Sequence, residues 1–427
     1  MTIQMICALA ILVVMVVLIM TDALPFGAPP LLADCLIVVA GVLFGANWEV
    51  KWDIPYAFAG FTNTSVWMIA FFMVVLAAFQ KTSFTAKLRN WMFKLVEKGG
   101  FKGYMLLVIL VMVACLLTGG HSTGYYVLIL GIVSTIPYDK NLPTSKLLMP
   151  LGFGCYHPVN IAVNFGLCIG ILEGANIVTE NISMVAFTAL TLLGCVGYFI
   201  WCVASYKLLP DHPIADQQEK SDEAFQSTMP SWKEGVTVAS LVISVLGMMF
   251  VTQLGDIAYV LPGILAFILL GIGVISWKEM RDNLFSPIVL MMCCAIPVAN
   301  ALADSGLAAL IGNAVAGAAA DMPLFVLVFA FCLLTSLSTT FTGAAFASAY
   351  IFVPIVIAAC VSLGVDPIGP AAATTMSAFA GGFLPIDGLP ALVFGMGNYK
   401  MTEFWKFTIP MWIVNCLFLA IGAVLVF

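Results

Sequence analysis

Small polar side chains gather in two stretches of an otherwise apolar chain. The hydroxyl residues of these stretches are Ser122, Thr123, Ser338, Thr339, Thr340 and Thr342. His121 adjoins the first group, which glycines flank on both sides. Hydroxyl groups donate and accept hydrogen bonds without carrying charge, so both stretches could bind a small ion or a polar solute. The alternative is that the hydroxyls pack between helices or bond to carbonyls of their own helices.

Titratable groups also lie in two later apolar segments, each of which contains glycine and proline. His157 lies in the first segment and Asp387 in the second. Ionisable side chains are costly inside a membrane and mark functional sites by default. Because both residues lie close to a proline of their segment, we expect them to approach each other and, with His121, to serve a step linked to protonation. A structural histidine, with an aspartate that caps a helix or binds a cation, is the alternative.

Helix breakers interrupt both of these segments. The breakers are Gly152, Gly154 and Pro158 in the first segment, and Gly381, Gly382, Pro385, Gly388 and Pro390 in the second. Interruptions at corresponding places in two halves are the best sequence indication of a transport site. The reason is that irregular backbone is tolerated inside a bilayer only where it is buried in protein or lines a wet cavity. We therefore add Asn160, Asn164 and Gly388 to the candidate site.

The composition indicates which elements hold these residues. Of 427 residues, 62% are hydrophobic and 9% are charged, whereas soluble domains carry about 25% charged residues. Apolar runs such as Ile3–Met20, Val236–Val251 and Phe407–Phe427 are long enough to cross, or nearly cross, a hydrocarbon core of about 30 Å. We expect an all-α polytopic membrane protein whose first run is retained rather than cleaved as a secretory signal. The lipid bilayer is then a partner, and nothing indicates nucleic acid.

The charged residues indicate an orientation. The segment 81–102 carries the basic residues Lys81, Lys87, Arg89, Lys94, Lys98 and Lys102, and only one acidic residue. The positive-inside rule places this segment in the cytoplasm, either as an amphipathic helix on the membrane surface or as a solvated loop. Counting apolar runs from there places the N-terminus and the C-terminus outside a multi-pass inner membrane protein. Asp34, near the start of its apolar run, is expected at the level of the lipid headgroups.

The two halves of the chain resemble each other weakly. The tetrapeptide Cys115–Thr118 recurs as Cys332–Thr335, and the basic segment 81–102 corresponds to Asp304–Asp321, which contains no Lys or Arg. Opposite charge indicates opposite sides of the membrane, so we expect an inverted-topology repeat, a common architecture of secondary transporters. The predicted parts are a first repeat over 1–206, a cytoplasmic linker over 207–232 and a second repeat over 233–427.

Each half is predicted to contain about five transmembrane helices, one re-entrant hairpin and a helix that is broken at the midplane. The first hairpin spans Tyr104–Ile136 with its tip near Gly119–Gly124, and its two apolar segments are each short for a full span. The second spans Leu324–Ala359 with its tip at Ser336–Gly343. The hairpins should enter from opposite sides of the membrane.

Four motifs carry a family resemblance. They are Phe58–Phe61, Phe383–Ile386, Val393–Gly395 and Asn398–Met401. With the repeat and the paired breaks, they make the chain similar to the divalent anion/sodium symporter family of the ion transporter superfamily, whose members carry dicarboxylates, citrate or sulfate. The resemblance implies a homodimer with a moving transport domain. It also implies that the hairpin tips and the broken helices hold sodium and the substrate carboxylates.

The chain departs from the motifs of that family. Where the family has Ser-Asn-Thr at the hairpin tips, this chain has His121–Thr123 and Ser338–Thr340. The second broken segment, Pro385–Ala391, keeps two prolines but lacks the family's Thr and Asn. The resemblance implies Na⁺ near the tip threonines Thr123 and Thr340, while the missing asparagines leave coupling to Na⁺ or to H⁺ open.

We expect a secondary active transporter of small organic anions, di- or tricarboxylates such as succinate, malate or citrate, that works by alternating access with cation coupling or exchange. No basic residue lies at either predicted site, so helix dipoles, histidines or co-bound cations must neutralise the anion. The alternatives are a cation/proton antiporter and a transporter of inorganic oxyanions such as sulfate or arsenite. Because no His-Glu-x-x-His and no Walker A sequence occurs, we expect neither an enzyme nor a bound cofactor.

Overall fold

The computed structural model describes most of the chain, and every regular element in the described part is a helix. The described residues are 1–20, 24, 28–84, 87, 91–92, 94–95, 99–117, 126, 129–130, 132–133, 143–157, 159–179, 182–212, 229–250, 254–319, 322–342, 345–385 and 388–427. No β-strand occurs among these residues, which confirms the all-α prediction.

The helices form two sets along the chain. The first set contains α1 (Ile3–Met20), α2 (Ala28–Phe44), α3 (Ile54–Ala57), α4 (Thr64–Gln80), α6 (Gly100–Leu117), α8 (Thr144–Gly154), α9 (Ile161–Gly174) and α10 (Met184–Ser205), with short 3-10 helices η1 (Gly45–Asn47) and η2 (Ala59–Thr62). The second set contains α11 (Ser231–Met249), α13 (Asp256–Gly271), α14 (Trp277–Leu284), α15 (Pro287–Asp304), α16 (Leu307–Ala319), α17 (Leu324–Thr342), α18 (Ala345–Leu363), α19 (Ile368–Ser377), α20 (Gly388–Gly397) and α21 (Met401–Val426).

Several helices have the length and composition of membrane spans. Within the described residues, six are long and apolar enough to cross a membrane, namely α2 with η1, α6, α10, α17, α18 and α21. Many of their apolar side chains face outward, for example Val42 and Leu43 of α2, which are exposed by 79% and 66%. Apolar surfaces of this extent are stable against lipid rather than water. The prediction of a polytopic membrane protein is confirmed.

Polar side chains determine where several helices begin. Asn63 caps α4 by accepting a hydrogen bond from the Val66 amide at 3.2 Å. Ser183 caps α10 by accepting one from the Val185 amide at 3.1 Å. A side-chain oxygen at this position satisfies one of the free N–H groups in the first turn of a helix. Asn160 starts α9 in the same way, directly beside the candidate site.

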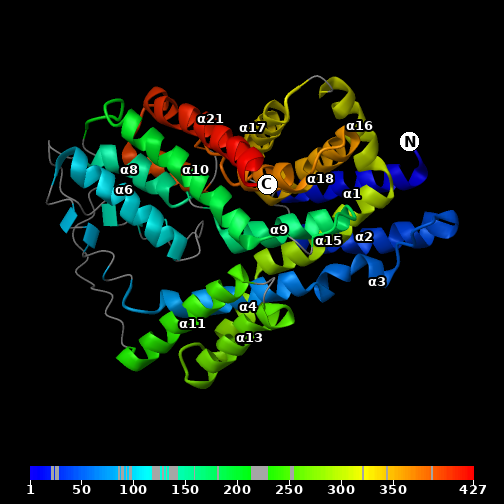
Figure 1. The fold of residues 1–427 in the computed structure, drawn as a ribbon, viewed down its shortest axis with the longest axis horizontal. Helices are drawn as coiled ribbons and strands as arrows, with labels where there is room; N and C mark the ends of the chain where they lie inside the picture. The colour runs from blue at the N-terminus through cyan, green and yellow to red at the C-terminus, as the bar shows by residue number, and fades with distance from the viewer. Residues whose placement is uncertain are drawn as a thin grey trace.

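Helices from the two halves of the chain interleave. In Figure 1, α4 lies beside α11 and α13, whereas α10 lies along α21 at the opposite side of the molecule. The contacts come in corresponding pairs, because α1 packs on α2 as α11 packs on α13, and α2 packs on α15 as α13 packs on α4. Corresponding contacts favour the predicted repeat of 1–206 and 233–427, which stays a prediction.

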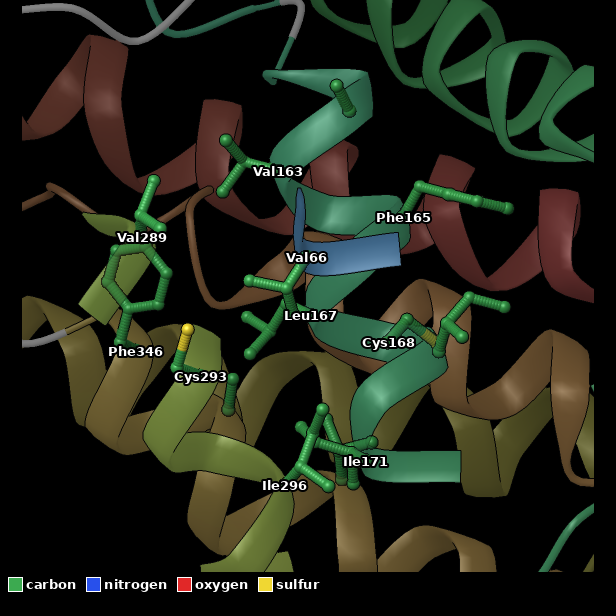
Figure 2. Close-up of a cluster of buried hydrophobic side chains, with 14 of the residues drawn as sticks. Val66, Val163, Phe165, Leu167, Cys168, Ile171, Val289, Cys293, Ile296 and Phe346 are labelled. Atoms are coloured by element: carbon green, nitrogen blue, oxygen red, sulfur yellow. The ribbon is translucent and has the colours of Figure 1, made fainter. Parts of the chain in front are cut away.

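Helix α9 is enclosed by the rest of the fold, with nearly all of its residues buried. Figure 2 shows Ile171 of α9 against Ile296 of α15, within the larger cluster of buried apolar side chains. A methyl group at Gly170 would lie 2.9 Å from Cγ1 of Ile296, so the glycine allows the two helices to approach closely. The two helices are therefore packed closely at this point, and α15 cannot move toward α9 without displacing it.

The second predicted hairpin differs from the structure at its tip. Helix α17 continues to Thr342, so the predicted end at Thr335 was wrong. Three hydroxyls of the predicted tip, those of Ser336, Thr339 and Thr340, instead donate to the carbonyl four residues earlier in the same helix, at 2.6–3.2 Å. Back-bonded hydroxyls do not end a helix. Because α6 and α17 have 18 and 19 residues, their length does not mark them as re-entrant, and the hairpins stay a prediction.

Gly152 and Gly154 do not interrupt the first broken segment, contrary to the prediction. Gly152 lies inside α8, whereas Gly154 is its last residue, so the interruption begins after Gly154. A methyl group at Gly152 would lie 2.6 Å from Cγ2 of Val393. The absence of a side chain at Gly152 therefore allows α8 to pack closely against α20.

Candidate functional site

Two broken helices run past each other in the fold. The first comprises α8, the described residues 155–157, 159 and 160, and α9; the predicted breaker Pro158 lies outside the described residues. The second comprises α19, the described residues 378–385 and α20. Because α8 packs on α20 and α9 packs on α19, the two interruptions face each other. A methyl group at Gly382 would lie 3.2 Å from Cε1 of Phe153, so the second break approaches the end of α8 closely. The paired interruptions predicted from the sequence are present and adjacent.

His157 lies at the first break, where it is 6% exposed and held from three sides. Its Nδ1 lies 3.0 Å from the carbonyl oxygen of Phe153, and its Nε2 lies 2.7 Å from Nδ2 of Asn415 in α21. The imidazole ring also stacks on Tyr198 of α10, with ring centres 4.5 Å apart and planes 3° from parallel. A carbonyl only accepts, so Nδ1 carries the proton and a neutral Nε2 accepts from the Asn415 amide.

A small cavity of about 20 Å³ lies beside His157. Val159 of the first break and Ala380 of the second both line it, as does Asn415 of α21. The oxygen Oδ1 of Asn415 is buried and has no hydrogen-bond partner in the described part of the protein. The cavity therefore joins the two breaks at a place with an acceptor available for a water-sized ligand.

The two predicted asparagines have different roles at the start of α9. Oδ1 of Asn160 accepts from the Val163 amide at 3.1 Å, and its carbonyl accepts from Nδ2 of Asn164 at 2.9 Å. Asn160 is therefore the helix cap. Asn164 is 1% exposed, and its Oδ1 has no partner among the described residues. Of the two, Asn164 is the one with a side-chain oxygen available to a donor or a cation.

Thr340 connects α17 to the second break. Its hydroxyl donates to the carbonyl of Ser336 at 2.8 Å and accepts from the Gly382 amide at 3.0 Å. Gly382 has a φ of 118°, a backbone conformation that favours glycine. A methyl group at Gly381 would lie 2.8 Å from Oγ1 of Thr340 and 2.9 Å from the Ser336 carbonyl oxygen. The structure thus uses Thr340 to hold the break against α17, and one lone pair of its hydroxyl oxygen is left for a further donor or a cation.

The other predicted hydroxyls also make hydrogen bonds within or between helices. Ser338 accepts from the Ser348 hydroxyl of α18 at 3.0 Å, which joins the two helices. Thr339 donates to its own helix at Thr335. The packing alternative therefore accounts for the hydrogen bonds that the structure gives to Ser338 and Thr339.

Several predicted site residues lie outside the described part of the chain. They are His121, Ser122, Thr123 and Asp387, so the expected approach of Asp387 to His157 and the expected Na⁺ near Thr123 stay predictions. Thr342 is the last residue of α17 and Gly388 is the first of α20. The stretch Gly120–Gly124 has Gly-x-Ser-x-Gly spacing. That spacing indicates a hydrolase only between a strand and a helix, and the described residues contain no strand.

Sequence reasoning did not identify Asn415, Tyr198 and Trp412 as members of this region. Trp412 donates from Nε1 to the Ser336 hydroxyl at 2.6 Å, so α21 contacts both α17 and His157. Asn415 is the only amide side chain in the apolar helix α21. An isolated amide in a membrane helix commonly forms hydrogen bonds across helices, and this signal could have found it.

The described site contains no strong ion ligands. Among the described residues, no group of three or more His, Cys, Asp or Glu side chains could hold a metal ion. The described parts of both breaks also lack Lys, Arg, Asp and Glu. What remains are amides, hydroxyls, helix ends and one imidazole. These groups can form hydrogen bonds and exchange a proton.

Comparison with solved structures supports the fold. The YdaH transporter of Alcanivorax borkumensis, described as having an unusual topology, matches with a TM-score of 0.65 at 15% identity, over 93% of this chain and 97% of that one. MtrF of Neisseria gonorrhoeae, described within a class of antimetabolite efflux pumps, matches with a TM-score of 0.61 at 12% identity, over 94% of this chain and 95% of that one. At these identities the likeness shows the fold alone.

Sequence comparison identifies the family. An uncharacterized transporter of Haemophilus influenzae is 28% identical over 142 residues, which are 33% of this chain and 31% of that protein. The uncharacterized transporter YfbS of Escherichia coli is 25% identical over 150 residues, 35% of this chain and 23% of that protein. The chain thus spans less than a third of the length of these relatives. The sequence profile of the citrate transporter family, CitMHS, matches residues 15–350. This chain therefore belongs to the citrate transporter family of membrane-embedded secondary transporters, which are not enzymes.

Proposed function

We propose that this protein carries small organic anions, di- or tricarboxylates such as succinate, malate or citrate, by alternating access coupled to H⁺ or Na⁺ or by exchange. The family match is the observation that carries the proposal, since it extends over both the first broken helix and α17. The facing helix breaks supply a place for the solute, because broken backbone inside a membrane protein offers unpaired polar groups to a ligand.

The anion is bound in this proposal without a basic side chain. The described parts of the breaks contain no Lys or Arg, whereas α9 and α20 both begin there. Free N–H groups and the positive end of the helix dipole favour a carboxylate at such a position. The predicted tip residues His121, Ser122 and Thr123 are included as further donors.

Proton coupling is proposed at His157. In the observed arrangement the neutral ring accepts a hydrogen bond from Asn415. A proton on Nε2 would face the Nδ2 donor, which is unfavourable. Rotation of the Asn415 amide would present Oδ1, the oxygen that now lacks a partner, and restore a hydrogen bond. The protonation state of His157 is thereby linked to the side chain of α21 and to the cavity between the breaks.

Sodium coupling is the second form of the proposal. Oδ1 of Asn164 and Oδ1 of Asn415 are buried acceptors without partners among the described residues. Amide oxygens are neutral ligands that suit a hard monovalent cation. Asp387 and Thr340 are included in the proposed cation site because the sequence places them at the second break and at the adjoining end of α17.

The proposed assembly is a homodimer in the inner membrane with both chain ends outside and residues 81–102 in the cytoplasm. Native mass spectrometry of the detergent-extracted protein measures the number of subunits. Labelling of single added cysteines at each end, in intact cells, measures the orientation. A monomeric mass, or labelling of the ends from the cytoplasm alone, would require a different assembly or topology.

Uptake into proteoliposomes tests the proposed activity. Labelled succinate, citrate and sulfate are supplied separately under an imposed proton gradient, an imposed sodium gradient or an internal load of the same anion. We expect accumulation of at least one carboxylate under one of these three conditions. Accumulation of sulfate alone would favour the oxyanion transporter. Proton movement driven by a cation gradient, without flux of any anion, would favour the antiporter.

A further inference from the structure

Asp34 in α2 is an acidic side chain enclosed by apolar helices, remote in sequence from the helix breaks. It is 0% exposed, although its place near the start of an apolar run predicted a position among the lipid headgroups. Neither of its carboxyl oxygens accepts from an N–H or O–H donor among the described residues, and the only donor beside it there is the weak thiol of Cys294. A buried acid is normally paired with a cation or with several donors, so this environment needs an explanation.

The groups that face Asp34 are neutral. They are the thiols of Cys293 and Cys294 on α15 and the phenol of Tyr350 on α18. A thiol is only a weak donor, so Cys294 beside the carboxyl group does little to stabilise a negative charge. The helices and the 3-10 helix packed around α2, namely α1, α3, α15 and η1, contain no Lys, Arg or His in their described residues.

The remaining titratable groups nearby do not supply a positive charge. Cys35 follows Asp34 on α2 but is exposed, and Cys7 lies on α1. Asp304 at the end of α15 already accepts a hydrogen bond from the Tyr56 hydroxyl at 2.8 Å. The charged residues Glu49, Lys51 and Asp53 of the segment after η1 are exposed, not buried with Asp34.

We propose that the Asp34 carboxyl group is a proton-binding site, occupied by one proton in the packing seen here and distinct from the site at the helix breaks. An ionised carboxylate without a cation or strong donors is far less stable in such a place than the neutral acid. Loss of the proton to water becomes favourable only when α2 and α15 separate enough for water to reach the carboxylate. The bound ligand is therefore a proton, and its release follows movement of these helices.

Helix α15 connects this proton site to the transport region. One face of α15 packs on α2, beside Asp34, and another packs on α9 of the first broken helix. The contact between Ile296 and Gly170 is close, so α15 has little freedom to move without α9. A charge at Asp34 would therefore favour arrangements of α15 and α9 that differ from the one seen here.

Infrared spectroscopy of the full-length protein in lipid membranes at neutral pH tests the proposal without any substrate. Wild type should show the carbonyl stretch of a protonated carboxyl group, and Asp34→Asn should lose that intensity. Asp34→Glu should retain a band at a shifted frequency, because an added methylene changes the group but keeps the acid. Asp304→Asn is the matched control and should leave the band unchanged.

A second measurement covers the case in which a substitution alters folding. The thermal midpoint of wild type should fall as pH rises from neutral to alkaline, because deprotonation leaves a buried charge, while that of Asp34→Asn should not. Identical neutral-pH spectra for wild type and a folded Asp34→Asn would overturn the proposal. The infrared and stability measurements do not depend on anion uptake. The proposal of a proton site at Asp34 and the proposal of anion transport can therefore fail independently.

Discussion

The first helix break carries a titratable side chain that the described part of the second break lacks. His157 is bonded to Asn415 of another helix, beside a cavity that reaches both breaks. The second break instead makes neutral contacts, in which Gly381 and Gly382 lie against α17 and Thr340 accepts from the backbone. In the sequence the two breaks look alike as runs of glycine and proline. On the proposed function, the first break responds to protons and the second sets the geometry of the site.

The largest expected effect is at the second break, whose described residues carry no titratable side chain. Gly381→Ala should destabilise the protein by about 3 kcal/mol, at the upper end of usual overpacking costs, because its methyl group meets a backbone carbonyl that cannot rotate away. The uptake rate should fall as well, because the added methyl group separates the break from α17. Thermal midpoints in detergent and uptake rates measure both effects. Gly395→Ala in α20, with no atom within 4 Å of the added methyl, is the matched control and should be neutral.

A smaller effect is expected at the first break, which carries His157. Asn415→Leu removes the donor to His157 and leaves a buried acceptor unpaired, at a cost of about 2 kcal/mol. Uptake should also lose part of its pH dependence, because the His157 ring can no longer change its hydrogen-bond partner from Nδ2 to Oδ1 of Asn415. Thermal midpoints and uptake at several pH values are the measurements. A variant with unchanged uptake at every pH would remove Asn415 from the coupling step.

Thr340→Val tests the hydrogen bond that holds the second break against α17. The substitution keeps the shape of the side chain but leaves the buried Gly382 amide without its acceptor, which should cost about 1 kcal/mol. The pH dependence of uptake should stay as in wild type, because no titratable group is changed. Thr335→Val is the control, since among the described residues that hydroxyl donates to a carbonyl of its own helix. Equal destabilisation by the two substitutions would mean that Thr340 does not hold the break.

The smallest effect is expected far from both breaks, at the ion pair of Lys81 with Glu279, whose Nζ and Oε1 lie 2.6 Å apart. The hydrogen bond from Lys81 lowers the pKa of Glu279 to about 2. Stability from this pair is therefore present above the ordinary carboxyl pKa and is lost as pH falls toward about 2.

Lys81→Met should cost less than about 1 kcal/mol near neutral pH, because both side chains are partly exposed. It should also remove this part of the acid dependence, which thermal midpoints across the acidic range measure. A change in the neutral-pH profile of uptake would show that the ion pair, and not only His157, contributes to the pH dependence of transport.

Part of this structure could be predicted from the sequence. Apolar length predicted the membrane helices, and the paired prolines and glycines predicted two adjacent breaks. The end of α17 was predicted wrongly because Thr339 and Thr340 look polar in the sequence but donate to carbonyls of their own helix. Gly152 looked like a helix breaker, whereas its role is the close contact with Val393 of α20. A hydroxyl group can bind a ligand or bond to its own helix, and a glycine can break a helix or allow close packing. Only tertiary contacts distinguish these roles.

The partners of His157 were beyond sequence reasoning for another reason. Asn415 lies 258 positions away in the chain, on α21, which packs along α10, the helix whose Tyr198 stacks on the ring. Asp34 was placed at the membrane surface because its position in the helix was known but the helices around it were not. Burial of a single polar residue depends on long-range packing, which local patterns do not contain.

The most direct test is carboxylate uptake by proteoliposomes at equal pH on both sides, measured from neutral pH to well below about pH 6.5, where an ordinary imidazole titrates, because the Asn415 amide opposes a proton on Nε2 in the observed arrangement. Wild type is compared with His157→Gln, after thermal midpoints have established that the variant is folded. The account predicts that uptake by wild type varies with pH through this range and that the variant retains slower uptake with a flat profile. The same pH profile in both proteins would contradict a protonation-linked role for the first break.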